Sequence, residues 1–107
     1  SQARTYAQKA ISFNENYGEP YILLAQMYGS NPNWSDEPAL NRCTYYVVID
    51  KLQRAKAVDP SVTDKVNELI ATYARHTPQA KDLFMLGYKA GDRITIGGWI
   101  GESTTIR

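Results

Sequence analysis

The sequence predicts a mainly α-helical fold that ends in a short β-hairpin. Apolar side chains recur at the three- and four-residue spacing of helices through most of the chain. Breaks rich in glycine and proline divide this pattern into segments of helical length. After Asp92 the apolar spacing changes to two, and β-branched residues dominate, which is typical of strands.

Length and charge limit the classes of function. The 107 residues suffice for one domain with a modest core. Lys and Arg total 12 against 11 Asp and Glu, so the net charge of +1 gives no reason to expect a nucleic-acid partner. No stretch approaches the roughly 20 apolar residues of a membrane-spanning helix, so no membrane insertion is expected. Cys43 is the only cysteine and is expected to be a small, partly buried residue.

Five helices are expected, and turn-forming residues mark their ends. Gly29 is expected to stop the second helix. Asp59 ends the third, because the proline that follows it disfavours helical backbone. Ser61 is a candidate cap for the fourth, and Gly91 is expected to stop the fifth. The expected ranges are 3–14, 19–28, 39–57, 61–76 and 79–89.

An internal repeat relates these helices. The second helix contains Tyr21-x-x-Leu24-Ala25-x-x-Tyr28, and the fourth contains Val66-x-x-Leu69-Ile70-x-x-Tyr73 in phase with it. The helices that follow them carry Val48-x-x-x-Leu52-x-x-Ala55 and Ala80-x-x-x-Phe84-x-x-Gly87. Small residues at such positions let paired helices approach closely, and each pair must stack on a neighbour to bury its face. An ordinary antiparallel bundle with the same spacing is the alternative.

This pattern resembles the tetratricopeptide repeat family. The resemblance implies a right-handed solenoid of helical hairpins, with about two and a half repeats over residues 1–92 and an insertion near residues 30–43. Ile70 departs from the family pattern, because a small residue is expected there.

Residues 93–107 are expected to form a β-hairpin cap. The predicted strands, Arg93–Ile96 and Ser103–Ile106, are joined by a glycine-rich connection that carries Trp99. A two-stranded hairpin is marginal alone, so it is expected to lie on the helices, as solenoid caps do. Its side chains, Ile94, Ile96 or Trp99, are expected to pack on Phe84 and Tyr88.

Two stretches narrow the resemblance. KLQRAKAVDP, residues 51–60, and the ending GDRITIGGWIGESTTIR, residues 91–107, look like the C-terminal part of uncharacterised tetratricopeptide repeat proteins of Gram-negative anaerobic bacteria. The resemblance implies a longer parent with more repeats upstream, and it suggests the cell envelope or periplasm as one location. It brings no known catalytic residues.

No catalytic, cofactor-binding or metal-binding residues are predicted. His76 lies at a helix end, where a cation suits the helix dipole. Asp36 and Glu37 are adjacent loop carboxylates without further ligands, which is typical of solvated residues. Gly97-Gly98 does not lie between a strand and a helix, as a dinucleotide-binding loop would.

Binding is the expected function. In tetratricopeptide proteins the first helix of each pair lines a concave groove, and the resemblance assigns five candidate groove residues here: Ile22, Gln26, Asp64, Asn67 and Arg75. Asn67 and Arg75 suit the amides or carboxylate of an extended peptide. Trp34 and Trp99 are candidate exposed aromatic contacts.

The sequence therefore predicts a noncatalytic module that binds a protein or peptide and needs no cofactor. One alternative is an oligomerisation or assembly element of the cell envelope, which forms a homo-oligomer through the tail and the Trp34 loop. Another is a glycan or peptidoglycan binder that uses its aromatic side chains as stacking platforms.

Overall fold

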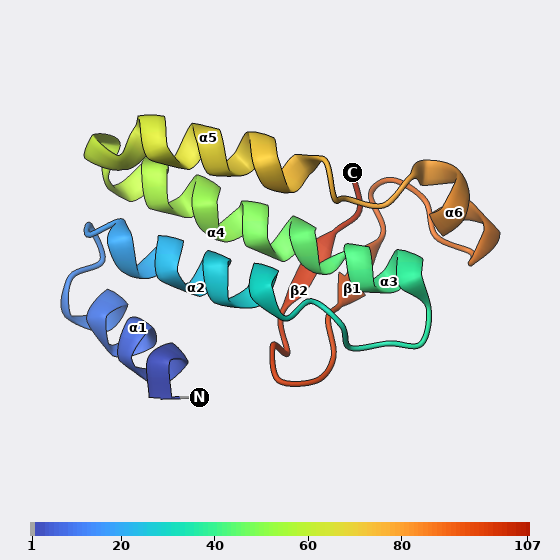
Figure 1. Cartoon of the computed structure of the whole chain (residues 1–107), viewed down its shortest axis with the longest axis horizontal. Helices are drawn as coiled ribbons and strands as arrows, with labels where there is room; N and C mark the ends of the chain where they lie inside the picture. The colour runs from blue at the N-terminus through green and yellow to red at the C-terminus, as the bar shows by residue number, and fades with distance from the viewer. Residues whose placement is uncertain (1) are drawn as a thin grey trace.

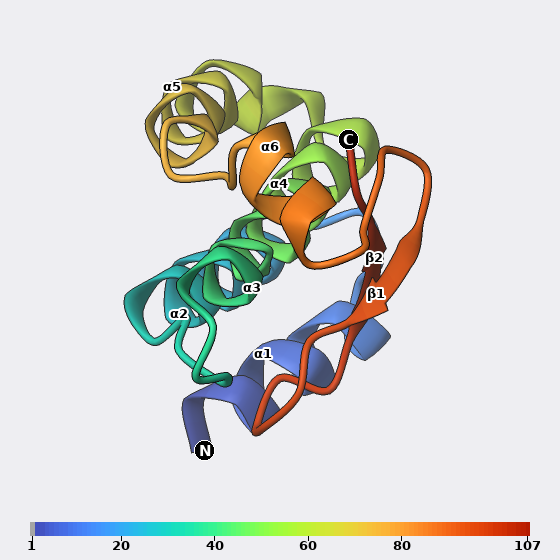
Figure 2. The same cartoon turned by 90° about the vertical axis from the view of Figure 1, so that its right-hand side faces the viewer.

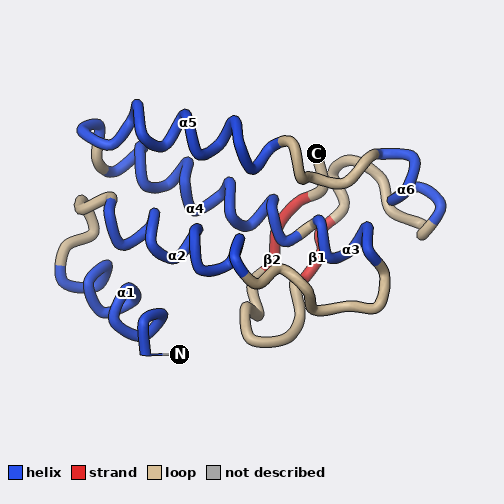
Figure 3. The backbone as a smooth tube through the Cα atoms, viewed as in Figure 1, coloured by secondary structure: helices blue, strands red, loops and turns tan. Residues whose placement is uncertain are grey.

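Four helices lie side by side in the computed structural model, which describes residues 2–107. Successive helices alternate in direction and pack on their neighbours along the chain (Figure 1). They are α1 (Gln2–Phe13), α2 (Glu19–Ser30), α4 (Thr44–Val58) and α5 (Thr63–Ala74). A two-stranded antiparallel sheet follows at the C-terminal end (Figure 3). The prediction of a mainly helical fold with a terminal hairpin is confirmed.

The core lies chiefly between α2 and α4, the two helices in most extensive contact. Each of these helices buries a small residue there: Ala25 of α2 and Ala55 of α4 are both fully buried. Leu52 and Tyr28 are also fully buried and fill the space around them. These residues share the repeat pattern, so the pattern identified one buried stripe on each helix of this pair.

Two turns meet at one edge of the helices. The Asp59 carboxylate accepts hydrogen bonds from the backbone N–H of Ser61, at 3.2 Å, and of Gly18, at 2.9 Å. The cap of the short 3₁₀ helix η1 (Pro60–Val62) is therefore Asp59, and Ser61 is its partner rather than the cap. One side chain thus joins the turn after α1 to the turn after α4. Hydrogen bonds from the Ser61 side chain and the Gly18 backbone lower the pKa of Asp59.

The expected third helix is divided at Cys43. A short helix, α3 (Pro38–Arg42), precedes α4, and the loop before it is fixed by one amide. The Asn41 side-chain oxygen accepts from the backbone N–H groups of Trp34 and Ser35, at 2.9 and 2.8 Å. Its nitrogen donates to the Ser35 carbonyl at 2.9 Å. The loop from Trp34 to α3 is therefore ordered.

The last helix, α6 (Ala80–Met85), is shorter than expected. The glycine that terminates it is Gly87, whereas Gly91 was expected. Gly87 has a φ of +90°, a value that glycine adopts readily. The Tyr88 N–H donates to the Leu83 carbonyl at 2.9 Å, and the Gly87 N–H to the Phe84 carbonyl at 3.0 Å. This is the Schellman arrangement that closes many helices. Helix α6 contacts α3 and does not run alongside α5 (Figure 1).

The hairpin has the predicted strands. Strands β1 (Arg93–Thr95) and β2 (Ser103–Thr105) are antiparallel, with Ile94 opposite Thr104. The Ile96 N–H donates to the Glu102 carbonyl at 2.8 Å, which extends the pairing beyond β1. The buried side chains of this tail are Ile94, Ile96, Ile100, Thr104 and Ile106.

The strands of the hairpin pack on α4, and the residues after β2, Ile106 and Arg107, line a cavity with Leu83 and Phe84 of α6. Figure 2 shows the strands on the side of the molecule opposite α2 and α5, and β2 contacts α4. Phe84 of α6 is 76% exposed, so the expectation that the tail buries it is wrong. The reason is the early end of α6, after which the chain turns back along α4.

Candidate functional site

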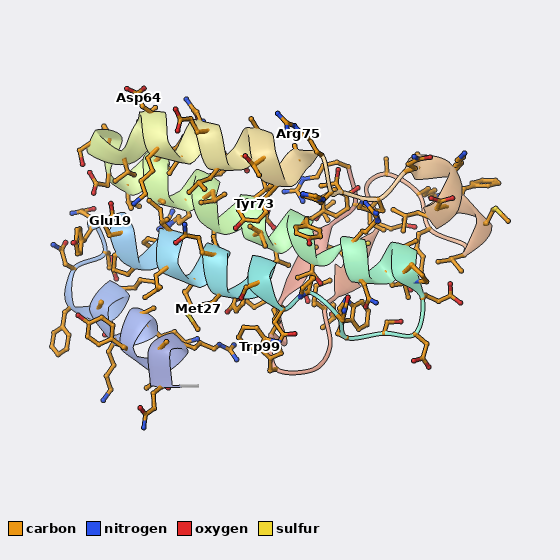
Figure 4. All side chains as sticks on the ribbon, in the orientation of Figure 1. Glu19, Met27, Asp64, Tyr73, Arg75 and Trp99 are labelled. Atoms are coloured by element: carbon orange, nitrogen blue, oxygen red, sulfur yellow. The ribbon has the colours of Figure 1, made fainter. Side chains whose placement is uncertain are left out.

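The structure places the five predicted groove residues on α2, on α5 and directly after α5, in different environments. Asp64 and Arg75 lie on the outer side of α5, and both are exposed (Figure 4). Gln26 is exposed on α2. The side-chain oxygen of Asn67 accepts a hydrogen bond from Lys56 Nζ of α4 at 3.0 Å, so Asn67 is engaged within the chain.

Ile22 is only 1% exposed, so it belongs to the core and offers no side chain to a groove. Helix α2 has neighbours on more than one side: it packs on α1 and α4, and its Glu19 pairs with Lys65 of α5 at 3.2 Å. Gly29 of α2 also lies close to the Tyr73 ring of α5. The buried arc of α2 is therefore wider than the single stripe assumed from the repeat pattern.

The two tryptophans are half-buried and serve internal packing. A Cβ placed on Gly97 would lie 3.1 Å from Trp34 Cε3, so the Trp34 ring rests on the glycine-rich connection. Trp34 Nε1 donates to the Leu40 carbonyl at 3.1 Å. The Trp99 ring meets the Tyr28 ring edge to face, with centroids 5.3 Å apart. Neither indole is an open stacking platform.

Polar contacts clasp the tail to three helices. Arg4 of α1 donates to the Trp99 carbonyl and, at 2.9 Å, to the Ile100 carbonyl. The Tyr28 hydroxyl of α2 donates to Glu102 Oε2 at 2.6 Å. Lys51 Nζ of α4 lies 2.6 Å from Glu102 Oε1. The connection between the strands thus ties α1, α2 and α4 together.

A second set of contacts holds the C-terminal end against α4. The Thr104 hydroxyl donates to Asp50 Oδ2 at 2.6 Å, and the Arg107 guanidinium pairs with the same carboxylate. Arg107 also lies over the Tyr46 ring, 5.0 Å from its centroid, at a distance typical of a cation–π contact.

Burial raises the pKa of one thiol and several tyrosine hydroxyls of the folded chain. Burial, together with the hydrogen bond to Glu102 and its charge, raises the pKa of Tyr28 to about 12. Burial alone raises the pKa of the Cys43 thiol to about 11. The pKa values of Tyr46 and Tyr73 are raised chiefly by burial as well. Cys43 is thus a structural, unreactive thiol near neutral pH.

These shifts predict a loss of stability in alkali. A group whose pKa is higher in the folded chain contributes its full stabilisation below its ordinary pKa, because it is then neutral in both states. As pH rises above 9.0 for Cys43 and 10.0 for Tyr28, the unfolded chain ionises first. The free energy of unfolding should therefore fall until pH passes the folded values near 11 and 12. Urea midpoints measured at intervals of pH check this, and a midpoint that stays level or rises would contradict it.

The exposed apolar side chains gather at two ends of the molecule. Every large hydrophobic residue that is exposed among residues 2–107 belongs to one of two clusters. The α1 end face consists of Tyr6, Phe13 and Tyr17; the α6 end face consists of Phe84, Met85 and Leu86. Helices α1 and α6 lie at opposite ends of the long axis (Figure 1), which measures 42 Å.

Both end faces have a hollow beside them. Near α1, Tyr6, Tyr17 and Leu23 line a cavity of about 240 Å³. Near α6, Leu83, Phe84 and other residues line a cavity of about 420 Å³. Exposed apolar patches of this kind are typical of surfaces on which another macromolecule packs.

A polar cleft of about 600 Å³ lies between the insertion and the end of α5. The Tyr45 ring on its wall stacks on Tyr73 at 6.0 Å and lies 5.3 Å from the His76 ring. The Arg42 guanidinium donates to the His76 carbonyl at 3.3 Å, so it is partly engaged. Within residues 2–107, no three His, Cys, Asp or Glu side chains are grouped to hold a metal ion. The cleft therefore offers polar and aromatic contacts.

The sequence carried a signal for one of the end faces. Tyr6, Ala10 and Phe13 follow one another at intervals of four and three, which places them on one helical stripe, and Tyr17 follows in the turn after the helix. This stripe is distinct from that of Ala7, which is fully buried. Helix α1 therefore has two apolar stripes, and α2 covers the one that contains Ala7, so the other stays exposed. The α6 end face had no such signal, because Phe84 was expected in the core.

The fold and its surfaces define a mainly helical protein with a clasped hairpin and two apolar end faces. Comparison of the chain with protein-family models, curated proteins and solved structures finds no match. Among residues 2–107 there is no helix with the length and apolar character needed to cross a bilayer.

Proposed function

We propose that this chain is a noncatalytic protein–protein interaction module at the C-terminal end of a larger tetratricopeptide repeat protein. Helix pairs stack in a right-handed solenoid, and residues 93–107 clasp the last complete pair. The α1 end face receives a preceding helix of the same protein, and the α6 end face is free to bind a separate protein.

The observation that carries this proposal is the position of the exposed apolar residues. Phe13 is 89% exposed at one end and Met85 is 84% exposed at the other, whereas the helices between them bury their apolar stripes. Stacked repeats need this distribution, because each unit covers its neighbours and leaves apolar surface only at its ends. A closed bundle would leave no comparable pair of faces.

The two alternatives make different use of the aromatic side chains. An oligomerisation or assembly element was expected to pair identical copies through the tail and the Trp34 loop, and the exposed end faces would add apolar surface to such a contact. A glycan binder would stack sugars on exposed rings, but Trp34 rests on Gly97 and Trp99 packs on Tyr28. The exposed ring of Phe84 lies beside the aliphatic side chains of Met85 and Leu86, and such a mixed apolar surface suits a protein better than a sugar. The proposed partner is therefore a protein.

Site-specific photocrosslinking in the native cells tests the proposal. A photoreactive phenylalanine analogue replaces Phe13, Phe84 or, as a control, the exposed Glu68 in the middle of α5. We expect an intramolecular crosslink from position 13, a crosslink to a second protein from position 84, and neither from position 68.

Equal crosslinking from all three positions would contradict a function located at the end faces, as would the absence of any crosslink. Crosslinks from position 84 to a second copy of this chain would support the oligomerisation alternative. The far-ultraviolet circular dichroism of each variant shows whether the fold is retained.

A further inference from the structure

We infer that the hollow beside α6 binds a short peptide segment in which apolar side chains are flanked by carboxylates. The α6 pocket is defined here by Leu83, Phe84, Met85, Tyr88 and Ile106, with a rim of Lys81, Lys89 and Arg107. This inference rests on the proposed function, and it adds the chemistry of the partner.

The pocket has an apolar floor and exposed apolar walls. Leu83 and Ile106 are 1% and 3% exposed, so the floor is part of the protein core. Phe84 and Met85 are mostly exposed beside it. The cavity of about 420 Å³ has room for one or two large apolar side chains. An aromatic or long aliphatic residue would bury most of its surface there.

Backbone hydrogen bonds hold the pocket in its shape without a ligand. The Tyr88 N–H bond to the Leu83 carbonyl, at 2.9 Å, fixes the turn that separates Phe84 from Tyr88. The Gly91 N–H donates to the Ile106 carbonyl at 2.7 Å and joins the segment after α6 to the tail. A site that is formed in advance costs little ordering when a partner binds.

The charge of the rim selects the partner. Lys81 and Lys89 line the pocket, and neither has a carboxylate oxygen within 4 Å among residues 2–107. The third cation, Arg107, is paired with Asp50. Asp82 is also on α6 but does not line the pocket. Complementary charge raises the rate and the specificity of association, so a segment with Asp or Glu beside its apolar residues fits best.

Selection of random short peptides on the immobilised full chain tests this inference without assuming a sequence. We expect the enriched peptides to combine aromatic or aliphatic residues with Asp or Glu. The affinity of one enriched peptide is then measured by fluorescence anisotropy for the wild type and for three variants. Phe84→Ala removes a wall, Lys81→Glu with Lys89→Glu reverses the rim, and Phe13→Ala alters only the opposite end.

We expect the wall and rim variants each to weaken binding by about tenfold or more, as loss of a central contact in an interface does. Phe13→Ala is expected to bind like the wild type. All replaced side chains are exposed, so thermal unfolding should be nearly unchanged, which separates loss of binding from loss of fold.

Four outcomes would count against the inference, and they differ in what they say of the proposed function. In the first, the peptide binds the wild type and the Phe84→Ala variant equally but does not bind Phe13→Ala. The binding site would then lie at the α1 end, and the proposed function as an interaction module would stand. Enriched peptides that are basic refute the charge argument alone. A sedimentation mass that falls to the monomer in Phe84→Ala without peptide assigns the pocket to contacts between copies. Failure to enrich any peptide refutes the inference, and it refutes the proposed function as well only if position 84 also gives no crosslink.

Discussion

A chain that ends at Asp92 is expected to lose its cooperative unfolding transition. The missing residues include four buried isoleucines, of which Ile96 and Ile100 are at most 1% exposed. Truncating one such side chain to alanine costs about 2 to 5 kcal/mol. The summed cost of losing all four is therefore comparable with the whole free energy of unfolding of a typical domain, about 5 to 15 kcal/mol. Urea unfolding followed by circular dichroism should show a broad, non-cooperative change.

Two further variants calibrate this result. Ile100→Ala in the full-length chain should stay folded or nearly so, with the free energy of unfolding lowered by about 2 to 5 kcal/mol. Thr95→Ala, at an exposed strand position, should change it by about 0.5 kcal/mol or less. A truncated chain that retains a sharp transition near the wild-type midpoint would show that the tail is a dispensable appendage and not a clasp.

The local pattern of the sequence was enough to predict most elements. The breaks at Gly18 and Asp59 separate the helices where expected, and the change of spacing after Asp92 predicted both strands. These features depend on backbone preferences and on the burial of one face, which a short segment expresses by itself. The small residues Ala25 and Ala55 also predicted the close contact between α2 and α4 correctly.

What could not be predicted depends on contacts between distant segments. Nothing local in the hairpin indicates that its strands pack on α4 rather than α6, because either helix offers an apolar face. The position is fixed by pairs such as Arg4 with Ile100 and Thr104 with Asp50, which join residues far apart in the chain. For the same reason the exposed role of Phe84 depended on where α6 ends.

Of the candidate groove residues, the structure contradicts Ile22, which is buried, and the surface formed by the others stays a prediction. Gln26, Asp64 and Arg75 are exposed polar residues, as a binding surface needs. Ile22, by contrast, is turned toward neighbours in the core. The family resemblance supplied spacing along each helix, but the rotation of each helix about its axis is set by all of its neighbours together.

Gly18→Ala is expected to lower the free energy of unfolding by about 1 to 3 kcal/mol, the usual cost of overpacking. A Cβ at this position would lie 2.9 Å from Val62 Cγ2, 3.0 Å from Asp59 Cβ and 3.1 Å from the Ala55 carbonyl oxygen. The φ of Gly18 is −77°, so backbone strain has no part in the effect. Replacing glycine by alanine also favours folding by about 0.4 to 1 kcal/mol through the unfolded chain, but the clash outweighs this gain.

Gly29→Ala is the matched comparison, because it too introduces a methyl group at a close contact between helices. The obstacle there is the Tyr73 ring at 2.7 Å, a side chain that can rotate, whereas Gly18 meets a backbone carbonyl and a Cβ that cannot. Alanine is also favoured over glycine inside a helix by about 1 kcal/mol. Gly18→Ala should therefore be the more destabilising of the two in urea unfolding. The reverse order would mean that the turns after α1 and α4 do not hold the helix pairs together, and the contact between α2 and α5 would then be the one that stacks them.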